Sequence, residues 1–237
     1  MNMDLINTDL TNVDLNCDMG ELDDAAHEAA LMAYITSANI ACGGHAGDAR
    51  TMERTARLAL ERRVRIGAHP GYPDRENFGR LEIAMTPEAI ADTVHAQIAR
   101  LDEVVRRLGG AIVHVKPHGA LYNVAVHNAD VARAIALGMA RWNPLCTLYG
   151  LAGSPMLDVW RTMRMTVARE AFADRRYEPD GTLRSRQFPD ALITGPQEAA
   201  AQALRFARQG LADTICVHGD TPGSVAILQA CREALTW

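Results

Sequence analysis

The chain has 237 residues, a mass of 25.8 kDa and a formal net charge of −5, and 48% of its residues are hydrophobic. The acidic balance and the even spread of arginines argue against a nucleic-acid partner, and the sequence lacks the run of roughly 18 apolar residues that a membrane span requires. Five cysteines without a CxxC spacing argue against a disulfide framework or a zinc knuckle, so we expect a cytoplasmic protein.

Short apolar runs alternate with amphipathic segments of helical length along most of the chain. Residues 1–11 are polar, and we predict a flexible leader there, followed by a single domain over residues 12–237. The predicted strands cover residues 12–18, 35–42, 64–69, 111–117, 145–150, 165–170, 213–219 and, more weakly, 191–194. The predicted helices cover residues 23–34, 48–63, 87–108, 128–142, 155–163, 196–208 and 223–235.

This alternation is typical of repeated βα units with parallel strands. Seven or eight such units predict an α/β fold with a closed or nearly closed parallel barrel, and an open doubly wound sheet is the alternative. Residues 170–190 are polar, rich in arginine and too long for an ordinary connection. We predict that this segment forms a lid or a binding loop.

Polar and glycine-rich clusters begin where most of the predicted strands end. In parallel α/β folds the carboxyl ends of the strands meet at one rim, and this rim carries the functional site. Clusters that are far apart in the sequence are therefore expected to gather into one pocket, which favours an enzyme.

The first predicted strand carries Asp14, Asn16 and Asp18 at alternate positions, so their side chains share one face, and Glu21 follows in the next loop. Neighbouring carboxylates can hold a divalent metal ion or divide the roles of acid and base. The alternative is that Asp14 pairs with an arginine and Glu21 caps a helix. We predict catalytic roles for Asp18 and Glu21, and a binding role for Asn16.

The segment GGHAGD follows the second predicted strand and leads into a helix. Gly43, Gly44 and Gly47 would allow backbone amides to face an anion at the N-terminus of that helix, which predicts phosphate or carboxylate binding. The alternative is a tight turn in which Asp48 caps the helix. We predict binding roles for Gly43, Gly44, His45 and Asp48.

His69 ends the third predicted strand, and the fourth carries Lys116, the only lysine of the chain beside 23 arginines. In an extended strand His114, Lys116 and His118 share one face, so two imidazoles and an ammonium would converge. A lysine in a chain that otherwise uses arginine indicates that a compact, titratable amine matters, and chance or a salt bridge is the alternative. We predict catalytic roles for His69, Lys116 and His118.

The sixth unit contributes Glu170, Asp174 and Arg175, and the last strand ends in His218 and Asp220. We predict that these five side chains bind substrate or phosphate, because they also fall at strand ends.

A metal site remains open at this stage. Imidazole and carboxylate ligands would suit zinc, manganese or iron, but the sequence has neither an HExxH motif nor an HxxxH pair on one helix. If an ion is bound, we expect Asp18, His45 and His69 to be its ligands. The sequence also lacks a GxxxxGK[ST] loop, a GxGxxG motif after the first strand, a kinase signature and a GxSxG motif, so neither a typical NTPase nor an ordinary serine hydrolase fits.

Six segments together resemble the LamB/YcsF family over nearly the whole chain, from about Val13 to the final helix. They read LNCDMGE, ITSANIACGGHAGD, IGAHPGYPDRENFGR, KPHGALYN, EAFADRRYEPDGTLRSR and CVHGD. The chain departs from the family pattern at Leu81, where a second arginine after Arg80 is expected.

The resemblance implies a deacetylase-like, TIM-like barrel of seven strands. It also implies ATP-dependent 5-oxoprolinase activity, in which the lactam of 5-oxo-L-proline is opened to L-glutamate with hydrolysis of ATP. ATP would be a co-substrate, supplied with Mg²⁺, and the B and C subunits of 5-oxoprolinase would be the partners.

The chemistry suggests roles for the candidate residues. Phosphorylation of the lactam oxygen would turn a poor electrophile into a good one, so the site must manage anions. Lys116 and an arginine would stabilise phosphate or the substrate carboxylate, and the amides of GGHAG would hold a phosphate. Asp18 or Glu21 would position magnesium or activate water. His69 or His118 would give a proton to the departing nitrogen.

Two other functions remain open from the residues. A metal-dependent amidase or polysaccharide deacetylase would use Asp and His without ATP. A non-catalytic metabolite-binding subunit would use the same pocket only to hold its ligand.

Overall fold

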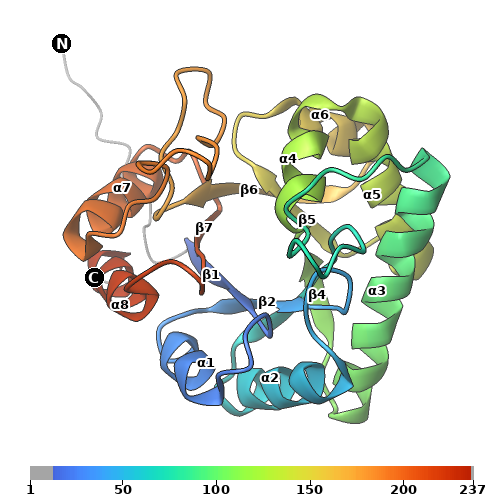
Figure 1. Ribbon diagram of the computed structural model, residues 1–237, viewed down its shortest axis with the longest axis horizontal. Coiled ribbons are helices and arrows are strands. Elements are labelled where there is room, and N and C mark those ends of the chain that lie inside the picture. The colour runs from blue at the N-terminus through green and yellow to red at the C-terminus, as the bar shows by residue number, and fades with distance from the viewer. Residues whose placement is uncertain (1–12, 236–237) are drawn as a thin grey trace.

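The computed structural model describes residues 13–235, and seven parallel strands close into a barrel (Figure 1). Each strand pairs with the next along the chain, and the last pairs with the first in a register that sets Asn16 beside Cys216. The strands are β1 (Asp14–Met19), β2 (Ser37–Ala41), β3 (Arg65–His69), β4 (Ile112–Val115), β5 (Thr147–Leu151), β6 (Thr166–Phe172) and β7 (Thr214–Val217). The leader predicted over residues 1–11 lies outside the described residues.

Eight helices of the described chain cover the outside of the barrel (Figure 1). Each strand is followed by one helix, except that β4 is followed by two. The helices are α1 (Ala25–Met32), α2 (Ala49–Glu61), α3 (Pro87–Arg107), α4 (Gly119–His127), α5 (Ala129–Trp142), α6 (Pro155–Thr162), α7 (Pro196–Arg208) and α8 (Ser224–Leu235).

The predicted α/β barrel is confirmed, and the open sheet is excluded because β1 and β7 pair. The weak strand predicted over residues 191–194 is wrong. Leu192 makes only an isolated bridge to Arg175, so the chain between β6 and α7 stays a long loop. The helix α4 was not predicted, because its sequence GALYNVAVH overlaps the motif KPHGALYN that was assigned to the site.

Alternation along β1 separates an apolar layer from a polar one. Leu15, Cys17 and Met19 are at most 1% exposed and belong to the hydrophobic core under the helices. Asp14, Asn16 and Asp18 are also buried, but they make hydrogen bonds with residues of other strands. The interior of the barrel is therefore filled largely by hydrogen-bonded polar side chains, and most apolar burial lies between sheet and helices.

One glycine makes room for this polar interior. A Cβ atom at Gly67 of β3 would lie 2.0 Å from Nε2 of His114 on the neighbouring strand β4. The imidazole thus occupies space that any other residue at position 67 would need.

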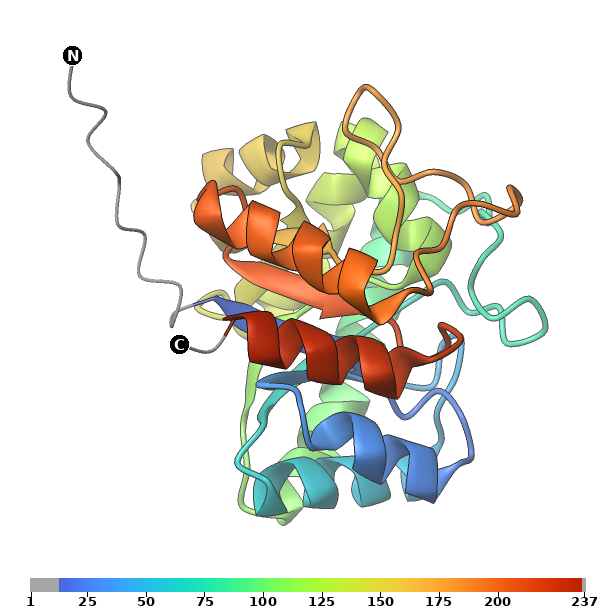
Figure 2. The same cartoon turned by 90° about the vertical axis from the view of Figure 1, so that its left-hand side faces the viewer.

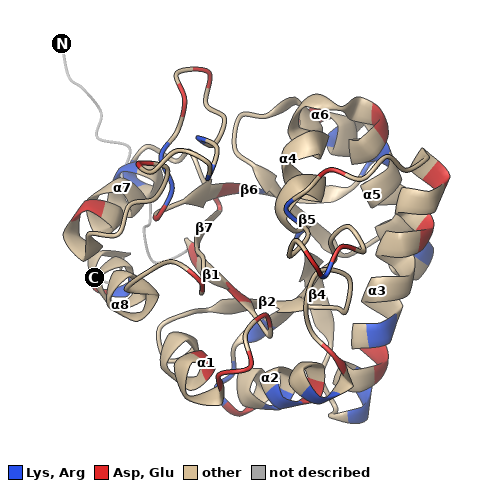
Figure 3. Cartoon of the chain, viewed as in Figure 1, with Lys and Arg blue, Asp and Glu red and all other residues tan. Residues whose placement is uncertain are grey.

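Two long loops extend from the carboxyl ends of the strands at the same end of the barrel (Figure 2). The β3–α3 loop covers residues 70–86, and the β6–α7 loop covers residues 173–195. Acidic and basic residues are interleaved on the outer helices α2 and α3 (Figure 3), which fits the absence of a basic field in the sequence. Within residues 13–235, no helix combines the length and the apolar character that crossing a membrane requires.

Candidate active site

A cavity of about 580 Å³ opens among the loops at the carboxyl rim of the barrel. Its volume falls in the range of sites that hold small molecules. Eight of the predicted site residues line it: Asp18, Glu21, His69, Lys116, His118, Arg175, His218 and Asp220. Residues from β1, β3, β4, β6 and β7 or the segments that follow them thus meet, as the placement at strand ends predicted.

The ammonium of Lys116 lies between two carboxylates under this cavity. Nζ donates to Oδ1 of Asp18 at 2.8 Å and lies 3.0 Å from Oε1 of Glu170, and the residue is only 2% exposed. Burial alone would lower the pKa of Lys116, but the charge of Asp18 and other neighbours raises it well above its ordinary value. Lys116 is therefore a fixed cation rather than an amine that titrates near neutral pH.

His118 does not share a strand face with Lys116, contrary to the sequence prediction. Strand β4 ends at Val115, and His118 lies at the N-terminal end of α4. His114 does lie inside the barrel, where its Nε2 is 2.7 Å from Oδ1 of Asn39 and its ring stacks on Tyr149. Burial is the main reason why the pKa of His114 falls to about 3, so the ring is neutral.

Asp18 is held in place from inside the barrel. Its Oδ1 accepts hydrogen bonds from Nζ of Lys116 and from Nδ2 of Asn39, each at 2.8 Å. Burial would raise the pKa of Asp18, but the charges of His69 and Lys116 hold it well below its usual value. Oδ2 of Asp18 lies 3.4 Å from Nε2 of His69, so a permanent carboxylate borders the histidines of the rim.

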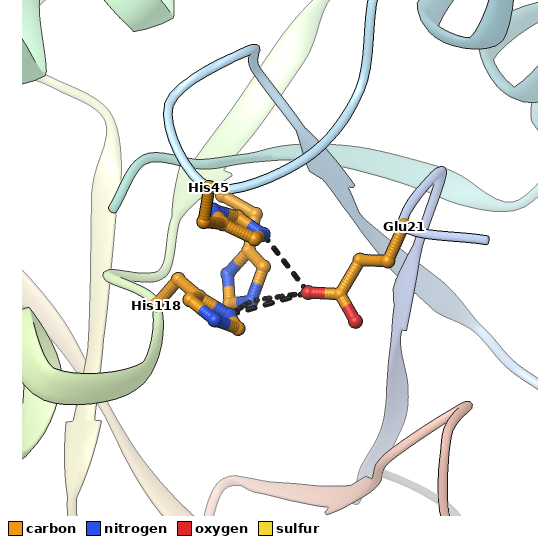
Figure 4. Close-up of side chains that lie close together, drawn as sticks. Glu21, His45 and His118 are labelled. Atoms are coloured by element: carbon orange, nitrogen blue, oxygen red, sulfur yellow. Dashed lines mark hydrogen bonds and ion pairs between the residues drawn. The ribbon is translucent and has the colours of Figure 1, made fainter. Parts of the chain in front are cut away.

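Three histidines lie beside the carboxylate of Glu21, and two of them, His45 and His118, are labelled in Figure 4. Oε1 of Glu21 lies 2.9 Å from Nε2 of His45, 3.2 Å from Nδ1 of His118 and 3.7 Å from Nε2 of His69. Burial would raise the pKa of Glu21, but its contacts with the imidazoles of His118 and His45 lower it far below the ordinary value. Glu21 is therefore an anion at the centre of an imidazole cluster.

Two groups of the described residues bring metal-binding atoms together. One contains Glu21, His45, His69 and His118, and its nitrogen and oxygen donors fit a divalent transition-metal ion. The other contains Cys216, whose thiol pKa burial raises well above its ordinary value, so that it is a poor ligand. The set expected from sequence included Asp18 in place of Glu21 and His118, but Oδ1 of Asp18 is bound by Lys116.

A buried guanidinium also borders the cavity. Arg175 is 5% exposed, its Nη2 donates to the carbonyl oxygen of Arg184 at 2.6 Å, and its Nε has no hydrogen-bond partner among the described residues. Burial and the nearby Arg186 lower the pKa of Arg175 to about 10, which still leaves it charged at neutral pH. Such a cation is suited to bind an anionic ligand.

Asp220 links the two rim loops. It forms ion pairs with Arg80 of the β3–α3 loop and with Arg186 of the β6–α7 loop, the latter at 2.8 Å. Burial would raise the pKa of Asp220, but Arg186 and His218 lower it. Asp220, Arg80 and Arg186 all line the cavity, so charged side chains from both rim loops border it.

Four other predicted residues lie behind the cavity. Asn16 and Glu170 are joined inside the barrel by a hydrogen bond of 3.1 Å, and both contact Lys116. Asp174 is buried and lies 3.0 Å from Nδ1 of His218, and His45 contacts Glu21. These side chains hold residues that line the cavity instead of lining it themselves.

Gly43, Gly44 and Asp48 do not reach the cavity. A Cβ atom at Gly43 or Gly44 would collide with side chains of α3, so these glycines allow close packing of a loop on a helix. Asp48 is exposed and accepts a hydrogen bond of 2.8 Å from the backbone of Thr51, which completes a capping box at the start of α2. The helix-cap alternative considered from the sequence describes Asp48.

Sequence reasoning missed Asn39 and Arg186. Asn39 sits in the middle of an apolar strand, ITSANIAC, and a polar residue at such a position is a signal that could have been used. Arg186 belongs to the segment predicted as a lid, but nothing in the sequence separates it from the other arginines there.

The sequence of this chain is similar to that of known proteins over nearly its whole length. The LamB/YcsF family model matches residues 13–237. The A subunit of 5-oxoprolinase from Chloroflexus aggregans is 46% identical and covers 95% of this chain and 96% of its own length. The protein of the same name from Bordetella pertussis is 42% identical over 94% of each chain.

The solved structures agree on the fold. The crystal structure of a lactam utilization protein from Thermus thermophilus has a TM-score of 0.88 and 38% identity, covering 94% of this chain and 96% of that one. A family 4 carbohydrate esterase from Streptomyces lividans has a TM-score of 0.51 and 13% identity, with 94% of this chain and 86% of that chain covered. The second likeness concerns the barrel alone.

Proposed function

Because this chain belongs to the LamB/YcsF family, we propose that it is the component of an ATP-dependent 5-oxoprolinase that binds 5-oxo-L-proline and opens its lactam to give L-glutamate. The observation that carries the proposal is a cavity lined by a buried arginine that forms no ion pair with the described residues, a fixed ammonium and two ionised carboxylates. Relatives are named as one subunit of 5-oxoprolinase, and we propose that this chain likewise acts with B and C partner subunits.

The cationic groups suit an anionic substrate and an anionic intermediate. We assign the substrate carboxylate to Arg175, because its guanidinium lines the cavity and its Nε has no hydrogen-bond partner among the described residues. Transfer of the γ-phosphoryl group of ATP to the lactam oxygen would leave ADP and an activated carbon. Lys116 and Arg186 are the cations beside the cavity that would offset the added charge.

Water then adds to the activated carbon and the carbon–nitrogen bond breaks, which leaves an acyl phosphate that a second water hydrolyses to L-glutamate and inorganic phosphate. Asp18 and Glu21 are ionised carboxylates that line the cavity and can orient the attacking water. The departing nitrogen needs a proton. We assign this role to His218 instead of His69 or His118, which were expected from the sequence, because Asp174 accepts from Nδ1 of His218 and leaves its Nε2 as the nitrogen that can exchange a proton.

A metal-dependent amidase or deacetylase is the second candidate, and the cluster of Glu21, His69 and His118 favours it. The two candidates differ in their need for ATP. A lactamase of the proposed kind releases glutamate only while ATP is hydrolysed, whereas a metal-dependent amidase needs no nucleotide.

The test is glutamate release from 5-oxo-L-proline by the chain together with its partner subunits, with and without ATP. We expect coupled release of glutamate and inorganic phosphate, and loss of about 100-fold or more of kcat in Asp18→Asn. Arg175→Met should act mainly on KM, because the carboxylate it binds is remote from the reacting carbon. An exposed surface variant, Arg133→Gln, is the matched control. Glutamate release that is independent of ATP would reject the proposal in favour of the amidase.

A further inference from the structure

Backbone carbonyls determine which ring nitrogens of His69 and His118 carry hydrogen. Nδ1 of His69 lies 2.8 Å from the carbonyl oxygen of Lys116, and Nε2 of His118 lies 2.9 Å from that of Phe78. A carbonyl oxygen only accepts hydrogen bonds, so each of these nitrogens is the one that bears the hydrogen. In the neutral rings, Nε2 of His69 and Nδ1 of His118 therefore carry no hydrogen, and each has a free lone pair.

These two lone pairs face one another and a carboxylate. The two nitrogens are 2.9 Å apart, and Oε1 of Glu21 lies 3.2 Å from the nitrogen of His118 and 3.7 Å from that of His69. With both rings neutral, these three acceptors have no hydrogen to share, and they repel one another unless a proton or a metal cation lies between them. Ligands of a tetrahedral zinc ion with bonds of about 2.0–2.1 Å are about 3.3 Å apart, which lies within the observed spread.

Ring orientation separates His45 from the other two histidines. The rings of His69 and His118 are nearly perpendicular, at 87°, so their planes intersect and both lone pairs can reach one ion. The rings of His45 and His118 are stacked 3.5 Å apart and only 5° from parallel. An imidazole binds a metal in its own plane, so an ion in the plane of His118 would lie well outside that of His45.

His45 has a different role beside the cluster. It does not line the cavity, its Nε2 is 2.9 Å from Oε1 of Glu21, and its Nδ1 has no hydrogen-bond partner among the described residues. These contacts are those of a neutral ring that donates from Nε2 to the carboxylate and leaves Nδ1 as an unused acceptor.

We propose that Glu21, His69 and His118 bind one divalent transition-metal ion, and that His45 is a positioning residue that orients the Glu21 ligand. All three ligands line the cavity, so a bound ion would be accessible from it. Two nitrogen donors favour Zn²⁺ or Co²⁺ over Mg²⁺, which prefers oxygen. When bound, such an ion supplies Lewis-acid polarisation of a carbonyl or phosphoryl oxygen. This proposal does not depend on the lactam reaction.

The first experiment uses the full chain without partners, stripped of metal by a chelator and titrated with Co²⁺, Zn²⁺ or Mg²⁺. We expect one Co²⁺ or Zn²⁺ per chain, visible Co²⁺ absorption bands and an X-ray absorption spectrum with two imidazole ligands. A chain that binds neither ion, or binds Mg²⁺ as tightly as Zn²⁺, would overturn the metal site. Three imidazole ligands would overturn the role of His45.

Variants separate ligands from the positioning residue. His45→Asn should weaken Co²⁺ binding by about 10- to 100-fold, as expected for a residue that hydrogen-bonds a ligand. Glu21→Gln and His118→Ala should each weaken it further, whereas His95→Asn on α3 should leave the affinity unchanged. Equal affinity in all four variants would contradict the proposal. If a ligand variant does not fold, the ligand count in the unmodified chain decides. Binding is read without turnover, so this test and the glutamate assay can fail separately.

Discussion

At the scale of single residues, Lys116 combines a role in the site with a role in stability. Replacement by Met leaves Asp18 and Glu170 buried without their shared cation. Breaking a buried ion pair in this way costs about 3–5 kcal/mol, so we expect Lys116→Met to lower the free energy of unfolding by that amount and to abolish turnover. Urea unfolding and the glutamate assay measure the two effects separately.

A double variant distinguishes the two roles. Adding Glu170→Gln to Lys116→Met removes one of the uncompensated charges, so part of the lost stability should return while turnover stays absent. If the double variant were no more stable than Lys116→Met, the ion pair between Lys116 and Glu170 would not be what stabilises the barrel interior.

His114 should make the protein sensitive to acid. Burial is the main reason that its pKa in the folded chain is about 3, whereas the ordinary value is 6.5. As the pH falls from about 6.5 to about 3, His114 becomes protonated in the unfolded chain but stays neutral in the folded chain. The free energy of unfolding therefore falls by up to about 1.4 kcal/mol per pH unit. Unfolding of His114→Gln by urea between pH 7 and pH 4 should therefore show a flatter pH dependence than the parent.

Tyr149→Phe is the matched control for this experiment. It keeps the aromatic ring that stacks on His114 and removes only the hydroxyl group that donates to Asp14. We expect it to lower stability while leaving the slope with pH largely unchanged. An identical slope in His114→Gln and the parent would assign the acid sensitivity to other groups.

At the scale of elements, Asp220 should couple the two rim loops. It pairs with Arg80 of the β3–α3 loop and with Arg186 of the β6–α7 loop. Asp220→Asn removes both ion pairs, so backbone amides of both loops should exchange hydrogen faster, while global stability changes by less than about 1 kcal/mol because the arginines are partly exposed. Asp190→Asn is the control, since Asp190 pairs with Arg184 within one loop.

The capping residue of α2, Asp48, allows a test of the prediction that the segment GGHAGD binds an anion. Asp48 caps this helix through the backbone of Thr51 and does not line the cavity. Asp48→Ala should therefore cost about 1 kcal/mol of stability without changing KM for the substrate or for ATP. Thermal melts and steady-state kinetics check the two parts. A clear rise in KM would return Asp48 to the site.

The elements were largely predictable because their signals are local. Alternation in β1 and Pro at the start of α3, α6 and α7 mark ends and faces directly in the sequence. The segment GALYNVAVH has no such start signal, since His118 makes no side-chain cap, and α4 was missed. The weak strand over residues 191–194 failed because β1 already pairs with β7 and leaves no place for an eighth strand in the barrel.

The site was predictable at its rim but not in its contacts. Placement at strand ends identified Asp18, His69 and Lys116, because the carboxyl ends of parallel strands converge. The hydrogen-bond partner of each side chain depends on distances across the barrel, which the sequence does not show. The contacts of Glu21 with three histidines therefore had no signal in the sequence. Asp48 and the glycines before it were assigned to the site for the same reason, since a turn looks alike whether it faces a cavity or a helix.

At the scale of the whole molecule, closure of the barrel should make stability depend on the last unit. β7 pairs with both β1 and β6, so removing residues 213–237 would expose unpaired edges on both neighbours. We expect this truncation to abolish the cooperative unfolding transition seen by circular dichroism, in line with one folded domain. A truncated chain that still melted cooperatively would contradict this.

Removal of residues 1–11 is the control for the truncation. The sequence predicts a flexible leader there, so its loss should leave the midpoint of unfolding within about 1–2 °C of the full chain. A larger shift would mean that the leader stabilises the domain.

The hydrogen-bonded filling of the barrel also bears on how this protein could be given new substrates. The single side chain of Asn39 forms hydrogen bonds with Asn16, Asp18 and His114, so a replacement of Asn39 disturbs all three partners at once. The β6–α7 loop carries Thr182, Ser185 and Gln187 at the cavity wall without such a network. Mutant libraries that aim to accept lactams of another ring size should therefore vary this loop. Random changes on the strands would mostly yield inactive variants.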